Sequence, residues 1–158
     1  MADIKTKYAS VASITISLAT LSDSAKRQSD VVDNSSNLYL DAQVQLKVKT
    51  GGTVSGDKAV YVYAYGTTDS GGLGYSGGAS GSDSAFSGTL ANTKLIGVIS
   101  TPASGTAYES DIMSVAAGFG GLLPGKWGII VENKSGSALD STESNHVKKY
   151  VGITAQSS

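Results

Sequence analysis

Glycines near the middle of the chain match a motif that binds dinucleotides. In GGLGYSGG, Gly72, Gly74 and Gly77 fit the pattern G-x-G-x-x-G, whose backbone cradles a pyrophosphate between a strand and the N-terminus of a helix. The residues that follow read GASGSDSAFSG and do not favour that helix. The segment 67–92 also contains no Lys or Arg to hold a phosphate. We therefore predict that the match is incidental and that the protein binds no cofactor.

A single histidine and scattered carboxylates are the other side chains with catalytic chemistry. His146 lies in STESNHVKK, and one histidine supports neither a two-histidine metal site nor an identified Ser-His-Asp triad. We expect it to be a surface turn residue. Two facing carboxylates hydrolyse glycosides, and the candidates for such a pair are Glu109, Asp111, Glu132, Asp140 and Glu143. Sequence does not show which of them meet, so a hydrolase stays an open alternative, while we predict no enzyme and no metal site.

Hydrophobic alternation with a period of two indicates the elements that position these side chains. The clearest example is NLYLDAQVQLKVKT, in which apolar residues from Leu38 to Val48 alternate with polar ones. ITISLA, AVYVYAYG, KLIGVIS, SDIMSVAA, KWGIIVEN and HVKKYVGITA continue the series, whereas DSAKRQSD is a possible short helix or turn. About seven or eight short strands separated by Gly, Ser, Asn and Asp clusters predict an all-β, antiparallel β-sandwich, with a jelly roll as its arrangement.

The domain organisation follows from length and from two unusual segments. The 158 residues suffice for one domain, and we predict a single sandwich over 1–158. Residues 1–10 are expected to form an extended arm, since the lysines and interrupted apolar residues at the start favour a strand over a signal peptide. The Gly- and Ser-rich loop 67–92 is longer than compact connectors usually are. We expect it to reach a partner.

Composition excludes several classes of partner. The chain has 12 basic and 13 acidic residues, and only 16% of its residues are charged, against about 25% in a typical soluble domain. Affinity for nucleic acid or an anionic membrane comes mainly from Lys and Arg, so we predict binding to neither. No apolar run reaches the length of a membrane helix. The absence of cysteine rules out disulfides and thiolate metal sites.

Aromatic residues are the remaining candidates for recognition. Tyr61, Tyr63 and Tyr65 share one face of a strand; they can fill one side of the sandwich, form an interface or stack on sugar rings. The segment SVAAGFGGLLPGKWG can plug the end of the core or contact another subunit. As interface residues we select Tyr8, Phe86, Phe119 and Leu122.

Several strings taken together resemble a known family. DNSSNLYLDAQVQLKVKTG, VYVYAYGT, KLIGVISTP, MSVAAGFGGLLPGKWGIIVEN and SGSALDSTESNH are similar to small virion structural proteins of tailed bacteriophages, along nearly the whole chain. The resemblance implies a capsid decoration or cement protein on the outer surface of the virion, bound to the major capsid protein and forming a homo-oligomer, with a trimer favoured. It transfers no functional residue, because no single motif carries chemistry. The alternative is a tail or head-fibre component that contacts host surface glycans through its tyrosines.

Overall fold

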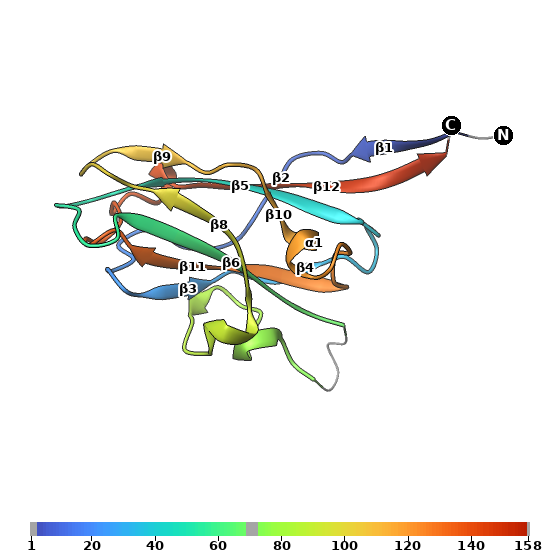
Figure 1. The fold of residues 1–158 in the computed structure, drawn as a ribbon, viewed down its shortest axis with the longest axis horizontal. Coiled ribbons are helices and arrows are strands. Elements are labelled where there is room, and N and C mark those ends of the chain that lie inside the picture. The colour runs from blue at the N-terminus through green and yellow to red at the C-terminus, as the bar shows by residue number, and fades with distance from the viewer. Residues whose placement is uncertain (1–2, 69–72, 158) are drawn as a thin grey trace.

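Two antiparallel sheets pack face to face in the computed structural model, which describes residues 3–68 and 73–157 (Figure 1). The β5–β12 sheet has the order β1-β12-β5-β10, with β2 beside β12 and β9 beside β5. It comprises β1 (Ile4–Tyr8), β2 (Ala12–Ser13), β5 (Asp41–Lys49), β9 (Ala107–Glu109), β10 (Met113–Ser114) and β12 (Val147–Ser157). The predicted all-β sandwich is therefore confirmed; the jelly-roll arrangement stays a prediction.

The β6–β11 sheet has the order β7-β3-β11-β6-β8, with β4 beside β11. It comprises β3 (Lys26–Gln28), β4 (Val32–Asp33), β6 (Ala59–Thr67), β7 (Ser84–Ala85), β8 (Lys94–Ser100) and β11 (Lys126–Lys134). The described helices are short: α1 (Val115–Gly118) and the single 3-10 turns η1 (Ser76–Gly78), η2 (Leu90–Asn92) and η3 (Glu143–Asn145).

The core lies between the two sheets and follows the predicted alternation. On β5, Val44 and Val48 are fully buried while Gln45 between them is exposed. The facing strands contribute the same pattern, because one residue in two points inward on a strand. The buried residues that meet from the central strands are Ala42, Val44, Leu46, Val48, Val60, Val62, Ala64, Trp127, Ile129 and Val131.

The predicted strand ITISLA crosses from one sheet to the other. Ile14, Ile16 and Leu18 are buried as the alternation predicts, yet residues 14–19 form no strand, because β2 ends at Ser13. The Ile14 amide donates to the carbonyl of Lys148 on β12 at 3.0 Å, whereas the carbonyl of Thr15 accepts from Asp30, beyond β3, at 2.8 Å. The segment therefore closes one side of the sandwich instead of extending a ladder.

Three local predictions were wrong in whole or in part. Leu38 and Leu40 precede β5 and are 72% and 46% exposed, because the chain turns at Leu38, which has a φ of 53°. DSAKRQSD begins with a turn at residues 23–24, one of the two forms expected, but then continues as strand β3, which pairs with β11. SDIMSVAA forms only the two-residue strand β10 before α1, whose first turn is capped by the Ser114 hydroxyl accepting from the Ala117 amide at 3.1 Å.

Candidate interaction surfaces and the sites they replace

The only histidine of the chain supports the backbone. His146 is 4% exposed, so the expectation of a surface turn residue was wrong. Its Nδ1 accepts from the Lys49 amide at 3.3 Å, and its Nε2 lies 3.0 Å from the Asp140 carbonyl oxygen. Because Lys49 N–H only donates and the carbonyl only accepts, the ring is the neutral tautomer with the proton on Nε2. Both nitrogens are used, and neither is available for catalysis or a metal.

Asp140 holds the turn before β12 in place. Its carboxylate accepts from the Asn145 side chain at 2.8 Å and from the Thr142 amide at 2.9 Å, and it pairs with Lys49 at 3.0 Å. The hydrogen bond from Asn145, then those from Thr142 and Lys49, hold the pKa of Asp140 well below its ordinary value. A carboxylate kept ionised in this way is a poor general acid.

Glu143 ties the crossing segment to the start of β12. Its Oε2 accepts from the amides of Leu18 and Ala19 at 2.9 and 2.7 Å, and its Oε1 accepts from the Lys148 ammonium. Partial burial raises the pKa of Glu143, but the hydrogen bonds from Lys148 and the Ala19 amide outweigh it and lower the pKa below its ordinary value. This contact is structural as well.

The remaining carboxylates are divided between the two sheets. Glu109 ends β9 in one sheet and Asp111 follows it, whereas Glu132 lies on β11 in the other sheet. Glu132 accepts from the Tyr63 hydroxyl at 3.3 Å and lies 4.0 Å from the Lys134 ammonium. Within residues 3–68 and 73–157, no group of three or more His, Cys, Asp or Glu side chains is placed to hold a metal ion.

The glycine-rich segment covers a sheet. Gly72 lies outside the described residues, while Gly74 and Gly77 have φ values of 68° and 72°, which glycine adopts without strain. Gly77 lies inside the single turn η1, directly against Thr93 and Phe86. This turn is too short for the helix that a dinucleotide fingerprint needs.

Residues 73–92, which we name the cover, pack on the outer face of the β6–β11 sheet (Figure 1). Phe86 is 4% exposed and packs with Tyr65 and Ile130 in a second apolar cluster. Tyr65 is fully buried; its ring stands edge-on to that of Tyr75 at 5.6 Å, and its hydroxyl donates to the Ser29 carbonyl at 2.7 Å. The described part of the loop 67–92 thus folds back on its own domain, whereas we predicted an arm that reaches a partner. Residues 69–72 of that loop lie outside the described residues.

The four predicted interface residues have different environments. Tyr8 and Leu122 are 61% and 66% exposed. Phe119 is partly buried against the main core. Phe86 is enclosed by its own chain and has little surface to offer, which corrects its selection: a Gly-rich loop does not reveal from sequence that its one phenylalanine folds inward.

The β1–β12 pair projects beyond the sandwich and carries both described chain ends (Figure 1). We name residues 4–8 and 153–157 the terminal ribbon; they pair from Ile4–Ser157 to Tyr8–Ile153. All five residues of β1 are exposed. Residues directly opposite in a ladder share a face, so the Ile4, Thr6, Tyr8, Ile153 and Ala155 side chains form one uncharged face. The expected arm at 1–10 therefore corresponds to a β-ribbon in its described residues.

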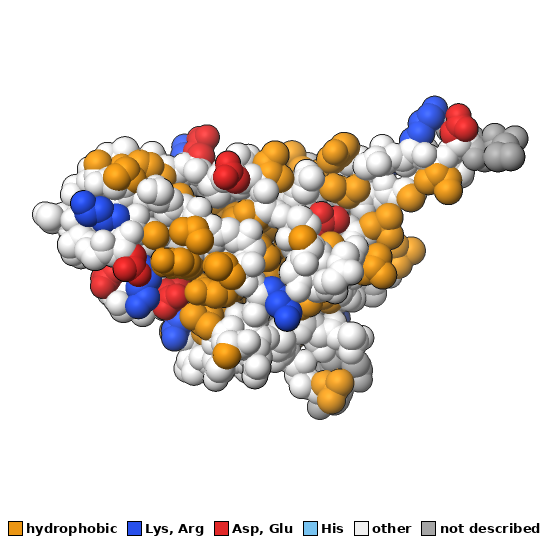
Figure 2. All heavy atoms as spheres, in the orientation of Figure 1, with side chains coloured by type: hydrophobic (Ala, Val, Ile, Leu, Met, Phe, Trp, Pro, Cys, Tyr) orange, Lys and Arg blue, Asp and Glu red, His pale blue; other side chains and the backbone are white. Residues whose placement is uncertain are grey.

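Exposed leucines surround the base of the ribbon. The Leu40 amide donates to the Ile153 carbonyl at 2.7 Å, and the Leu123 amide donates to the Leu40 carbonyl at 2.9 Å, so Leu40 and Leu122 lie where the ribbon leaves the sheet. Figure 2 shows charged side chains on the upper side of the ribbon and hydrophobic ones below it, facing the end of the sandwich, where more hydrophobic side chains gather. We name this concave corner the notch.

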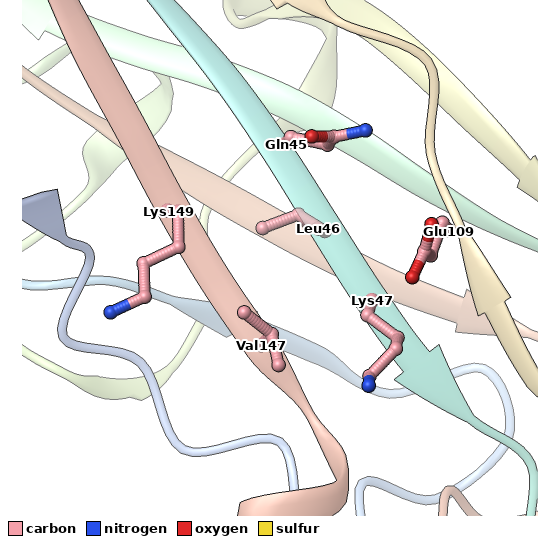
Figure 3. A pocket seen from close by; sticks show the side chains of 6 residues that line it. All are labelled: Gln45, Leu46, Lys47, Glu109, Val147 and Lys149. Atoms are coloured by element: carbon pink, nitrogen blue, oxygen red, sulfur yellow. The ribbon is translucent and has the colours of Figure 1, made fainter. Parts of the chain in front are cut away.

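A shallow hollow lies on the outer face of the β5–β12 sheet (Figure 3). It has a volume of about 290 Å³ and is lined by Gln45, Leu46, Lys47, Glu109, Val147 and Lys149. Lys47 stands opposite Glu109 in the ladder, and Lys149 donates to the Ser13 hydroxyl at 2.7 Å. Its mixed charge suits polar contact with another protein better than capture of an anion.

Sequence reasoning missed the pairing of the two chain ends and the apolar residues Ile4 and Leu40. One signal was present: in KKYVGITA, Tyr150 lies on one face of the strand and Val151 and Ile153 lie on the other. Apolar residues on both faces indicate that both faces are to be buried.

No helix in the described part of the chain has the length and apolar character needed to cross a membrane. Compared with protein-family models, with curated proteins and with solved structures, the chain shows no match.

Proposed function

We propose that the protein is a structural virion component: a capsid decoration or cement protein that binds the major capsid protein on the outer surface of a phage head and stabilises it. The observation that carries the proposal is the number and spread of large hydrophobic side chains left open to solvent. Ten are between 46% and 83% exposed among the described residues: Ile4, Tyr8, Val11, Leu38, Leu40, Leu73, Leu95, Val98, Ile112 and Leu122.

The spread of these side chains supports a protein that touches several neighbours. They lie at the ribbon and notch, on β8 at Leu95 and Val98, and beside the β5–β12 sheet at Val11 and Ile112. Figure 2 shows hydrophobic side chains gathered over the strands at the front of the molecule as well as near the ribbon. Apolar patches on a soluble protein mark contact sites, and a junction between capsid subunits offers several contact surfaces.

The charge of the chain supports an outer location. A formal net charge of −1 gives little attraction to packaged DNA, whose binding depends on neutralising phosphates. On the shell, many modest contacts sum through multivalency, because each bound patch raises the effective concentration of the next. High affinity at any one patch is not required.

The alternative, a tail or head-fibre component that holds host glycans, rests on the tyrosine row. Tyr65 is fully buried beneath the cover, and Tyr61 and Tyr63 are half-buried. Sugar stacking needs open ring faces, so the row is a weaker platform than the sequence indicates. The exposed apolar side chains favour the capsid role.

Cryo-electron microscopy of the parent particle, with this chain traced at side-chain level, tests the proposal. We expect density on the outer shell that bridges neighbouring capsid subunits. Heads stripped of the chain should rebind purified protein and become more resistant to heat. Density confined to the tail, or absence from the particle, would overturn the proposal.

A further inference from the structure

We infer that two copies of this chain associate through the free edge of β8, so that their β6–β11 sheets join across a two-fold axis. The two β8 strands run antiparallel in this pair, and Leu95 of each copy lies opposite Val98 of the other. The inference does not rest on the capsid role, since it concerns the purified protein alone. It commits to a two-fold pair, whereas the family resemblance favours a trimer.

The strand β8 ends its sheet and has one neighbour. In the described part of the chain it pairs with β6 alone, and no backbone hydrogen bond from outside this ladder reaches residues 94–100. On an edge strand, every second residue turns its N–H and C=O groups away from the ladder, where they can pair with another strand. The crossing segment closes the sandwich beside β3, on the opposite side of this sheet. It therefore leaves the edge of β8 open.

β10 and α1 contact β8 on its inner side, which faces the core. Gly97 lies against Met113, which is 3% exposed in the core, and Gly118 of α1 lies against Lys94. In the β6–β8 ladder, Gly97 stands opposite the fully buried Val62, and Lys94 also stands opposite a core residue. Directly opposite residues share a face, so both contacts leave the outer face of β8 uncovered.

The edge of β8 lacks the charges that commonly block pairing. Natural edge strands are protected by lysines, by proline or by very short length. Between Lys94 and Ser100, β8 reads LIGVI, without a charge or a proline. The other end strands of the two sheets differ, since β1 carries Lys5 and Lys7 while β7 and β10 have two residues each. Among the described strands, β8 is therefore the edge best suited to pairing.

An irregularity in the ladder brings Leu95 and Val98 to the same face. They stand opposite Tyr63 and Tyr61 on β6, and the register shifts between these two pairs. Residues three apart in a regular strand point to opposite faces, whereas these two are both on the outer face, 53% and 49% exposed. A bulge can turn an edge away from pairing. Two strands that share the irregularity stay matched when Leu95 of one lies opposite Val98 of the other.

The faces of the side chains select this register. With Leu95 opposite Val98, Ile96 of each copy lies beside Gly97 of the other, which has no side chain to obstruct it. A register centred on Gly97 would instead place Leu95 opposite Ile99. Ile99 is 2% exposed and points into the core, while Leu95 points outward. Because antiparallel partners share a face, this second register is disfavoured.

The pair joins the apolar outer faces of the two copies. Tyr61 and Tyr63 on β6 are half-buried and stand beside the exposed side chains of β8. Each row across the joined sheets then runs from β6 of one copy to β6 of the other in the order Tyr61, Val98, Leu95, Tyr63. Cross-strand pairs of aromatic and aliphatic side chains stabilise a sheet. Figure 2 shows hydrophobic side chains gathered in the area where Figure 1 draws β8.

A second copy supplies what this edge needs, a free antiparallel strand with the same irregular register and the same apolar face. Such a contact is isologous and closes on itself, so it ends at two copies. It involves one strand and its adjoining side chains from each copy, which places it among small interfaces, below about 1,200 Å² in total. We expect a reversible dimer that dissociates on dilution.

The test is the mass of the purified full chain over a wide concentration range, by sedimentation velocity and light scattering. We expect a monomer–dimer equilibrium for the unmodified protein. Leu95→Glu and Val98→Lys should each weaken dimerisation by about tenfold or more, because a charge is placed against an apolar side chain in the contact. The matched controls Leu122→Glu and Val11→Lys change an exposed leucine and an exposed valine outside β8. They should leave the dimer constant within about twofold.

An equal mixture of the Leu95→Glu and Val98→Lys variants tests the register. In the mixed pair, the introduced carboxylate of one copy lies directly opposite the introduced ammonium of the other, and the second site keeps its leucine and valine. Opposite charges in direct cross-strand positions attract. The mixture should therefore recover most of the dimerisation that each variant loses alone.

All four positions are exposed, so circular dichroism should show the same fold for every variant. A protein that is monomeric at every concentration would overturn the inference and leave the edge of β8 to a strand of another protein, such as a capsid subunit. A trimer would overturn the two-fold pair. A dimer that persists in both β8 variants would overturn the site, and a mixture without recovery would overturn the register.

Discussion

The cover and the terminal ribbon both leave the two sheets, yet only the cover is packed against its own chain. The cover contains few large apolar residues, and Phe86 is 4% exposed. Ile4 on the ribbon is 80% exposed, so the described part of the chain leaves it almost entirely open to solvent. Apolar content therefore does not decide which segment is buried; the segment that returns to a sheet becomes part of the domain.

The cover is held by polar contacts as well as by apolar ones. Asp83 accepts from Arg27 Nε at 2.5 Å and from the Ser17 hydroxyl at 2.6 Å, and the Ser80 amide donates to Gln28 at 2.8 Å. These anchors join the cover to β3 and to the crossing segment. The ribbon is held by its single ladder, and this difference predicts where substitutions will matter.

Phe86→Ala should have the largest effect. Removing a buried phenylalanine costs about 3–5 kcal/mol, and Phe86 packs with Tyr65 and Ile130. Urea unfolding monitored by circular dichroism measures the loss. The control Leu122→Ala removes an exposed side chain and should stay within about 0.5 kcal/mol. Equal small losses in both variants would mean that the cover adds nothing to the folded domain.

Tyr65→Phe should have the next largest effect. The Tyr65 hydroxyl is buried and donates to the Ser29 carbonyl at 2.7 Å, so its removal should cost about 1–2 kcal/mol. Tyr63→Phe is the matched control on the same face of the same strand, because its hydroxyl makes a longer bond of 3.3 Å to Glu132 at a partly exposed site. Comparing the two unfolding free energies checks the difference, and a larger loss for Tyr63→Phe would contradict it.

Acid should loosen the attachment of the cover. Burial raises the pKa of Asp83, but the hydrogen bonds from Arg27 and Ser17 outweigh it and lower the pKa below its ordinary value. A carboxyl whose folded pKa is depressed stabilises above its unfolded pKa of about 3.9, and this contribution is lost as the pH falls through the folded value. The protection factors of the amides in residues 73–92, which are corrected for the intrinsic exchange rate at each pH, should therefore fall on acidification below about pH 4.

Asp83→Asn should raise exchange in the cover at neutral pH and flatten its dependence on acid. Asp111→Asn is the control, since its side chain is exposed outside the cover. If the cover exchanged at the same rate in Asp83→Asn as in the unmodified chain, the anchor would not hold it.

Sequence predicted the sheets better than the segments between them. Alternation from Ala42 to Val48 is a local signal, since each buried residue follows from its neighbours on the strand, and the structure confirms it. The burial of Phe86 depends on its contacts with Tyr65 on β6 and Ile130 on β11, which are distant from it in the sequence. The pairing of Ile4 with Ser157 joins opposite ends of the sequence. No local pattern specifies such contacts, so the cover and the notch could not be predicted.

Single substitutions of exposed apolar residues outside the ribbon end should have the smallest effect on stability. Val11 and Ile112 are 66% and 65% exposed, so Val11→Ser and Ile112→Ser should change the unfolding free energy by less than about 0.5 kcal/mol. If the surface around Val11 and Ile112 contacts the capsid, both variants should bind more weakly than the unmodified chain to heads stripped of this protein. Urea unfolding measures the stability of each variant, and a loss above about 1 kcal/mol would mean that the substituted side chain packs against its own chain.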